Sequence, residues 1–204
     1  MAREAYIFLL PLLVLAVVAW AVGWVYLAFV FLGGGAFVGF FFRNPSRNIP
    51  EDPRLIVSPA DGRVIRVEPG EGGTQVSIFL SVFNVHINRA PIRGKIMMLS
   101  HKKGRFYLAF DERASVENEQ VVFTIEGEHN VTFSLIAGLV ARRIVPWKHE
   151  GEMVSRGERI GLIRFGSRVD IVIPGDCDVR VKQGDKVRGG SSILASWSEE
   201  DEAA

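Results

Sequence analysis

The first 42 residues and the rest of the chain have different hydrophobic patterns. Between Tyr6 and Phe42 there is no charged side chain, and this run is longer than the about 20 apolar residues that one membrane-spanning helix needs. It also exceeds the apolar core of a secretory signal, which has roughly 7–15 residues. Gly23 and the three glycines at 33–35 offer places for a turn. The pattern favours a membrane-embedded helical hairpin over residues 1–42, with one long span as the alternative.

The charges that flank the apolar run indicate its orientation. Arg3 precedes the run, and Arg43 and Arg47 follow it. Because cytoplasmic flanks favour Lys and Arg, we expect both ends of a two-pass hairpin inside the cell. The remaining domain is then expected at the cell membrane, on its cytoplasmic side.

Beyond the apolar run the pattern becomes that of a β protein. Residues 43–57 are polar and proline-rich, which is typical of a linker. Over residues 58–204, short runs rich in Val and Ile alternate with Gly-containing turns at spacings of roughly 8–12 residues. This pattern predicts an all-β fold, a flattened β-sandwich or barrel. A short helix is expected only within DERASVENEQ (111–120).

An internal repeat refines the expected architecture. EGEMVSRGERIGLI (150–163) and KQGDKVRGGSSILA (182–195) share a pattern of Gly, acid, Val, Gly and Ile at the same spacings. Such pairs occur in β-sandwiches of the biotinyl- and lipoyl-carrier kind, often related by a pseudo-twofold axis. A carrier also needs an exposed, modifiable Lys at a hairpin tip, and neither repeat has one. The repeat therefore predicts carrier-domain-like architecture without carrier chemistry.

Charge and cysteine content exclude some classes of function. The net charge is +1, so no global charge favours nucleic acid, and we expect no nucleic-acid partner. The single cysteine, Cys177, has no intrachain disulfide partner and no metal-ligand spacing around it. A reducing compartment and the absence of a metal site are the simple expectations.

Three polar segments stand out from the β pattern. FLSVFNVHINRAPIRG (79–94) places Asn84, His86 and Asn88 at alternate positions, which share one face if the segment is a strand. SPADGRV (58–64) places Asp61 before a glycine, where a carboxylate commonly caps a turn. RFGSRVD (164–170) is no serine-hydrolase elbow, because Val169 occupies the position of the second glycine.

These segments together identify a family resemblance. FFRNPSR, SPADG, FLSVFNVHINRAPIRG, GLVARRIV and GERIGLIRFGSRVDIVIP resemble the short form of the phosphatidylserine decarboxylase proenzymes, over nearly the whole chain. Members of that family cut themselves at a Gly-Ser bond and convert the serine into a pyruvoyl group. The resemblance implies cleavage between Gly166 and Ser167, with Ser167 becoming the pyruvoyl. It also implies a heterodimer of a β subunit, residues 1–166, and an α subunit, residues 167–204.

The resemblance also implies the reaction. The pyruvoyl at Ser167 would form a Schiff base with the amine of a phospholipid that has a serine head group. Loss of CO₂ would convert phosphatidylserine to phosphatidylethanolamine, or archaetidylserine to archaetidylethanolamine. His86 would protonate the resulting carbanion, and no metal or diffusible cofactor would be required.

The chain departs from the family pattern at positions that matter for self-cleavage. In the family the carboxylate of SPADG assists cleavage, which makes Asp61 the candidate here. Longer members have two histidines three residues apart, whereas this chain has His86 and then Arg89. Either His86 serves both stages, or Asp61 acts through water or with Arg89 as an electrostatic aid; we favour His86 in both. Asn84 replaces an Asp that is usual in the short form, and an amide still orients an imidazole.

Head-group recognition needs donors for phosphate and carboxylate oxygens. Asn84, Asn88, Arg89 and Arg168 are the candidates, because guanidinium groups match such oxyanions. Arg142 and Arg143 are further candidates that alternatively face anionic lipids. The rival function is a membrane-anchored, carrier-like β-sandwich adaptor without catalysis.

Overall fold

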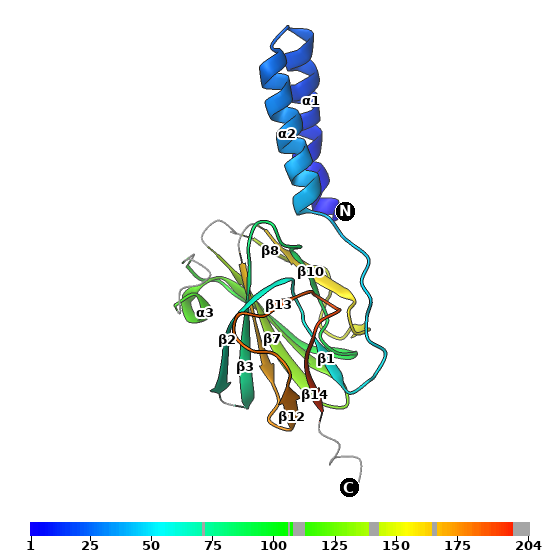
Figure 1. Ribbon diagram of the computed structural model, residues 1–204, viewed down its shortest axis with the longest axis vertical. Coiled ribbons are helices and arrows are strands. Elements are labelled where there is room, and N and C mark those ends of the chain that lie inside the picture. The colour runs from blue at the N-terminus through cyan, green and yellow to red at the C-terminus, as the bar shows by residue number, and fades with distance from the viewer. Residues whose placement is uncertain (71, 106, 108–112, 139–142, 165–166, 198–204) are drawn as a thin grey trace. The chain divides into compact units, whose positions relative to one another are not determined.

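The computed structural model describes the chain apart from residues 71, 106, 108–112, 139–142, 165–166 and 198–204, and apart from the side chains of residues 115 and 116 (Figure 1). It consists of two compact units, Met1–Ser46 and Arg47–Ala204. The first is helical and the second is built mainly of β-strands. Because the two units form separately packed bodies, each is described by itself.

The first unit is a hairpin of two antiparallel helices. A short 3₁₀ turn, η1 (Arg3–Ala5), leads into α1 (Tyr6–Ala21), and α2 (Val25–Phe41) follows after a turn in which Gly23 has a φ of 82°. Small residues lie between the helices and let their backbones approach closely, among them the buried Ala16, Ala19, Ala28 and Gly35. The hairpin that the sequence favoured over one long helix is confirmed.

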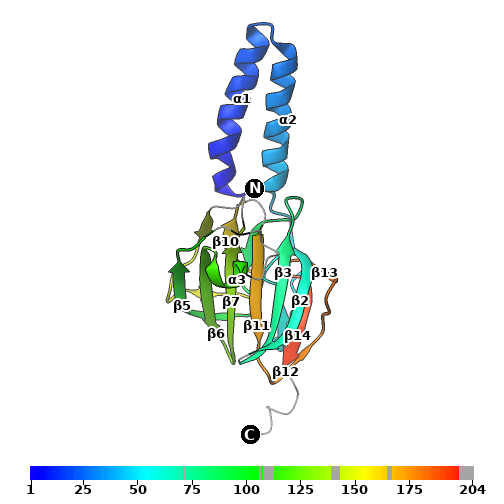
Figure 2. The ribbon, with the colours of Figure 1, turned by 90° about the vertical axis from the view of Figure 1, so that its left-hand side faces the viewer.

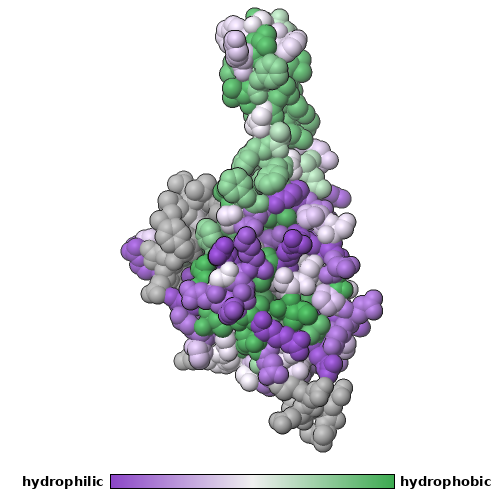
Figure 3. Space-filling view, viewed as in Figure 1, coloured by the Kyte–Doolittle hydropathy of each residue, from purple (hydrophilic) through white to green (hydrophobic). Residues whose placement is uncertain are grey.

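On the face seen in Figure 3, hydrophobic side chains cover most of this hairpin below its tip. Large side chains such as Trp20, Tyr26 and Phe29 are exposed on it. Residues Arg3–Ala21 form one helix that is long and apolar enough to cross a membrane, and α2 is equally apolar but shorter. An exposed apolar surface of this extent is stable in lipid and unfavourable in water.

The second unit contains fourteen described strands and one short helix. The strands are β1 (Leu55–Val57), β2 (Gly62–Gly70), β3 (Gly73–Leu80), β4 (Ile87–Arg89), β5 (Gly94–Lys102), β6 (Gln120–Glu126), β7 (Asn130–Ala137), β8 (Ile144–Pro146), β9 (Met153–Val154), β10 (Arg159–Ile163), β11 (Ser167–Ile173), β12 (Cys177–Val179), β13 (Lys186–Val187) and β14 (Ile193–Trp197), and the helix is α3 (Ala114–Glu117). The all-β prediction for this unit and the short helix expected within 111–120 are both confirmed.

The strands form one large curled sheet and two small ones. The large sheet has the order β13-β2-β3-β11-β7-β6-β5-β9, with every neighbouring pair antiparallel (Figure 2). The small sheets, β1-β14-β12 and β4-β10-β8, have three strands each. Alternate residues of the large sheet point inward, as Val169, Ile171 and Ile173 do on β11, and these positions form one buried core.

The segment between the hairpin and the first strand packs onto the second unit. Arg47 forms an ion pair with Asp61. The guanidinium of Arg156 donates hydrogen bonds to the backbone carbonyls of Pro50 and Asp52. Residues 47–57, whose composition is typical of a linker, are therefore held to the β unit from Arg47 onward.

The repeat seen in the sequence has the same backbone conformation in both copies. Gly151 and Gly184, which are 184 − 151 = 33 residues apart, have φ values of 89° and 97°. Gly157 and Gly190 have the same spacing, with φ values of 74° and 79°. Each copy forms a two-residue strand, a glycine turn and then a longer strand, β9 and β10 in one and β13 and β14 in the other.

The duplication extends beyond the repeat that the sequence pattern revealed. The N–H of Val57 donates to the carbonyl of Pro91 at 3.0 Å. In the same way, the N–H of Arg89 donates to the carbonyl of Pro59 at 2.9 Å. These two bonds are related by a shift of 91 − 59 = 32 residues. The strand order of the large sheet is likewise symmetrical about its β11–β7 centre. The β unit thus has a pseudo-twofold axis between β11 and β7.

Candidate functional site

Ser167 begins β11 at the centre of the large sheet. It pairs with Leu80 on β3 and with Ala137 on β7, and it is fully buried on the inner face. Within the described residues its Oγ has no hydrogen-bond partner. A buried hydroxyl without a partner carries a desolvation cost of about 1–3 kcal/mol, which suits a reactive group better than a structural one. Gly166, the other side of the expected cleavage bond, lies outside the described residues.

The fold brings His86 close to β10, the strand that precedes Ser167 in the chain. It lies directly before β4, and its backbone carbonyl accepts a hydrogen bond from Ile163 at 3.2 Å. Its side chain is fully buried, and Nδ1 lies 3.0 Å from the backbone carbonyl of Asn84. Because a carbonyl only accepts, Nδ1 carries the proton. In the neutral imidazole Nε2 is therefore the basic nitrogen.

The position of Asn84 differs from the expectation. Strand β3 ends at Leu80, so Asn84 lies in the loop before β4 and shares no strand face with His86. Its side-chain Oδ1 accepts hydrogen bonds from the N–H and the hydroxyl of Ser81, at 2.9 and 2.8 Å. The prediction of a continuous strand over Asn84, His86 and Asn88 is wrong at its first two residues, because the chain turns after β3 and only Asn88 lies on a strand. The backbone carbonyl of Asn84, and not its side-chain amide, orients the imidazole of His86.

Asn88 is the second polar side chain buried in this region. It lies on β4, opposite Gly161 of β10, and is fully buried. In the described part of the chain neither its Oδ1 nor its Nδ2 has a hydrogen-bond partner. A buried amide normally satisfies most of its hydrogen-bonding capacity. An unpartnered amide in this interior fits the reception of a polar ligand.

Asp61 is held by two groups that the sequence did not connect with it. One guanidinium nitrogen of Arg47 lies 2.9 Å from each carboxylate oxygen, and the N–H of Gly189 donates to Oδ1 at 2.8 Å. The Arg47 side chain is largely buried. The matching segment FFRNPSR contained Arg47, but only a tertiary contact links it to SPADG. Such charge-assisted bonds fix the position of the carboxylate.

Arg89 lies near Arg47, Arg159 and Asp61, whose charges act on it. Its Nη1 donates to the backbone carbonyl of Gly157 at 2.8 Å. Burial lowers the pKa of Arg89 from its ordinary value, and the charges of Arg47 and Arg159 lower it further, whereas Asp61 raises it. A guanidinium remains charged at neutral pH even so, which makes Arg89 an electrostatic group and not a base.

Asp61 and Ser167 lie at the same end of the large sheet on different strands. Arg63 on β2 pairs with Phe79 on β3, and Phe79 pairs with Arg168 on β11. Because adjacent strands are about 4.8 Å apart, β2 and β11 are separated by roughly 10 Å. The described hydrogen bonds of the Asp61 carboxylate go to Arg47 and Gly189. This placement favours an electrostatic role for Asp61 over direct proton transfer.

Arg168 faces the opposite side of the sheet from Ser167, because neighbouring residues of a strand point to opposite faces. Its Nε donates to the carboxylate of Asp170 at 2.6 Å, and its Nη2 donates to the hydroxyl of Ser77 at 2.9 Å. The guanidinium is thus engaged in a buried ion pair within β11 and in a hydrogen bond that ties β11 to β3. This geometry gives no support to head-group binding by Arg168.

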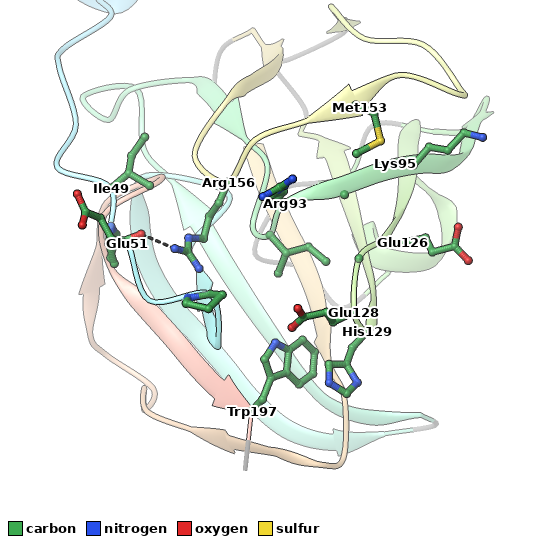
Figure 4. A pocket seen from close by; sticks show the side chains of 15 residues that line it. Ile49, Glu51, Arg93, Lys95, Glu126, Glu128, His129, Met153, Arg156 and Trp197 are labelled. Carbon is green, nitrogen blue, oxygen red and sulfur yellow. Dashed lines mark hydrogen bonds between the residues drawn. The ribbon is translucent and has the colours of Figure 1, made fainter. Parts of the chain in front are cut away.

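Two arginine candidates remain. Arg143 is exposed, and Arg142 lies outside the described residues. A cavity of about 790 Å³, which includes Trp197, His129 and Arg156, lies at the other end of the sheet (Figure 4). It is remote from Ser167, because Glu126 in its wall is the far end of β6.

Comparison with known proteins identifies the family. Residues 35–195 match the family model described as phosphatidylserine decarboxylase. A phosphatidylserine decarboxylase proenzyme of Solibacter usitatus is 46% identical, with 88% of each chain covered. That of Geobacter metallireducens is 45% identical over 95% of this chain and 94% of its own. That of Wolbachia pipientis is 42% identical over 97% and 91%.

The chain belongs to the phosphatidylserine decarboxylase family. It is therefore an enzyme, a carboxy-lyase, and the resemblance drawn from its motifs is confirmed. Its relatives are named proenzymes, which fits a precursor that is processed. The comparisons do not favour the rival function of a non-catalytic adaptor.

Proposed function

We propose that this chain is a self-processing decarboxylase of a phospholipid with a serine head group, and that its prosthetic group is a pyruvoyl made from Ser167. The observation that carries the proposal is the position of Ser167. It is a buried serine at the start of the central strand, its Oγ has no hydrogen-bond partner among the residues that the structure describes, and the chain's relatives are named phosphatidylserine decarboxylase proenzymes.

Self-cleavage follows from the chemistry of the Gly166-Ser167 bond. The Oγ of Ser167 attacks the carbonyl carbon of Gly166 while a base takes the hydroxyl proton. The C–N bond then breaks and the nitrogen of residue 167 takes a proton, which leaves an ester. Loss of the Cα proton expels Gly166 as a carboxylate and leaves dehydroalanine. Water adds, ammonia leaves, and residue 167 becomes the pyruvoyl group.

His86 is the base that the geometry supports best for this sequence of steps. Its Nδ1 is held as a donor by the Asn84 carbonyl, so Nε2 is free of that proton and basic. An imidazole can both take up and release a proton, which suits both stages of the reaction. Asp61 is paired with Arg47 and polarises the site electrostatically.

The same interior receives the head group after cleavage. The pyruvoyl group supplies an electrophilic carbonyl for the substrate amine and takes up the electron pair that departing CO₂ leaves. We assign hydrogen bonding of the head group to Asn88 and attraction of its anionic oxygens to Arg89. His86 delivers a proton to the substrate Cα. The buried surroundings of Ser167, Asn88 and His86 exclude bulk water from the reacting atoms.

The helical hairpin suits a lipid substrate. We propose that α1 and α2 anchor the enzyme in the cell membrane with the catalytic unit on the cytoplasmic side. Arg3 and Arg43 at the ends of the hairpin agree with that orientation. An anchored enzyme meets its substrate at high effective concentration.

The test is the covalent state of residue 167. Purified protein is expected to give two chains on a denaturing gel, with an intact mass for residues 167–204 that lacks the serine nitrogen. Ser167→Ala is expected to give one chain and no decarboxylation. Assays with phosphatidylserine and with archaetidylserine then identify the substrate. Recovery of an active enzyme as one uncut chain with an unmodified Ser167 would falsify the proposal.

A further inference from the structure

A second cavity lies on the outer face of the large sheet, at the Asp61 end of β2. It has a volume of about 950 Å³ and is open to solvent. Its walls come from β2, β3, the loop after β3 and the segment around β13. Arg63 and Phe79, which are paired on neighbouring strands, point into it, whereas Val64 and Leu80 beside them belong to the core. The cavity is therefore on the side of the sheet that Ser167 does not face.

Three exposed cations surround this cavity: Arg63, Lys186 and Arg188. Within the described residues none of the three forms an ion pair with a carboxylate. The acid in its wall, Asp61, is already paired with Arg47. The hydroxyl of Ser192 accepts the N–H of Arg188 at 2.9 Å and keeps its own proton for donation. The cavity therefore has an excess of positive charge and of donors.

An exposed aromatic residue lies in the loop that borders this cavity. Phe83 is 68% exposed, in the loop between Ser81 and Asn84, and both of those residues line the cavity. The hydrogen bonds from Ser81 to the Asn84 side chain hold that loop in a tight turn. An aromatic ring next to cationic side chains is the combination found on surfaces that lie at a lipid interface.

The pseudo-twofold axis provides an internal comparison. The cavity of Figure 4 is the symmetry counterpart, because Gly94 and Lys95 there correspond to Gly62 and Arg63. At the counterpart, Met153 takes the place of Lys186, and Glu126 and Glu128 take the places of Phe79 and Ser81. The counterpart also has three cations, but Glu51, Glu126 and Glu128 in its wall offset their charge. The excess of positive charge is therefore at one end of the sheet only. Fold geometry alone therefore does not account for the cationic cluster.

We propose that this cationic cavity is a second lipid site, which binds the phosphate of an anionic phospholipid while Phe83 enters the bilayer interface. A lipid is the occupant that fits, because the same chain has an apolar helical hairpin with one helix long enough to cross a membrane. Each Lys or Arg near an anionic surface contributes about 1 kcal/mol of attraction, or roughly fivefold in binding. The site is separate from the interior where the serine head group reacts.

The test uses the full chain in nanodiscs of phosphatidylcholine with an increasing fraction of phosphatidylglycerol. Amide hydrogen exchange is measured in residues 81–86 and 186–192. Phosphatidylglycerol is expected to slow exchange in both segments of the wild type. In the triple variant Arg63→Gln, Lys186→Gln, Arg188→Gln the protection is expected to need a much higher phosphatidylglycerol fraction, since each lost cation weakens binding roughly fivefold.

The matched control removes the same charge from other exposed positions. Arg93→Gln, Lys95→Gln, Lys103→Gln is expected to keep the wild-type protection. Equal loss in this control, or no protection in the wild type, would overturn the proposal. So would equal protection by inorganic phosphate in nanodiscs of phosphatidylcholine alone, because a free anion would then be the ligand. The uncut Ser167→Ala chain is expected to show full protection, so the result does not depend on self-cleavage.

Discussion

At the scale of single residues, hydrogen bonding separates structural polar groups from reactive ones. Asn118 is fully buried, and its amide binds Tyr107 and the carbonyl of Ala137. Ser167 and Asn88 are buried as deeply, yet within the described residues their polar atoms have no such partners. The desolvation of these two side chains is therefore not offset by hydrogen bonds, and it lowers the stability of the folded state. These are the two positions where the proposed chemistry needs a nucleophile and a head-group contact.

The residue-scale prediction concerns His86. His86→Gln keeps a side chain of similar polarity but removes the titratable nitrogen, so self-cleavage is expected to slow. Turnover of whatever processed enzyme forms is expected to fall by about 10²- to 10⁴-fold, the usual contribution of general acid–base catalysis. A time course of cleavage on gels and a CO₂-release assay measure the two effects separately.

The control for this variant is His101→Gln, because His101 is exposed and bonds only to Glu119 among the described residues. It is expected to be cut and to turn over like the wild type. If His86→Gln matched it in both assays, the proton donor would have to be another group.

Motifs predicted the proposed reactive residues but not their partners. Ser167, His86 and Asp61 were predicted from short segments that resemble those of the family. The pairing of Arg47 with Asp61 joins residues 14 positions apart, and the engagement of Arg168 by Ser77 joins residues 91 apart. Side-chain direction and loop geometry decide such contacts, and neither is visible in a linear pattern.

At the scale of elements, the duplicated glycine turns position the site. Gly157 and Gly190 both have positive φ, and a Cβ added to Gly190 would lie 3.4 Å from the Cα of Gly157. The two turns thus pack against each other beside Arg89, whose Nη1 binds the Gly157 carbonyl. Glycine is required here both for its dihedral angles and for the close approach.

The element-scale prediction is that Gly190→Ala destabilises the β unit. A left-handed conformation costs a residue with a Cβ about 1–2 kcal/mol. The new Cβ would also lie 2.9 Å from the Cδ of Arg89, so that side chain has to move. A lower midpoint in urea unfolding and reduced decarboxylation are expected together. Gly175→Ala is the control, since its Cβ would meet no atom within 4 Å and its φ is not left-handed; equal loss there would contradict the explanation.

At the scale of the whole molecule, cleavage would distribute the strands of the large sheet over two chains without disrupting their pairing. Strand β11 follows the proposed cut and pairs along its length with β3 and β7, which both precede the cut. Strands β13 and β14, also after the cut, pair with β2 and β1. Both chains therefore contribute to one hydrophobic core.

The prediction at this scale is that the two chains stay together after cleavage. They are expected to co-elute in size-exclusion chromatography in a mild detergent, and to separate only in denaturant, because separation exposes the central strand and the core. Intact-mass analysis of the eluted peak measures the ratio of the chains. Loss of residues 167–204 from the peak under native conditions would contradict this account.

By itself the sequence determined the two kinds of structure and the family, and it predicted the serine at which we propose that the chemistry is centred. Those features are local: an uncharged apolar run, period-two strands and short motifs of particular residue types. Only the tertiary structure decided that Asp61 pairs with Arg47, that Arg168 faces away from Ser167, and that one of two related cavities is cationic. Contacts between distant segments depend on strand register and on which face each side chain takes, and these follow from the packing of the whole sheet.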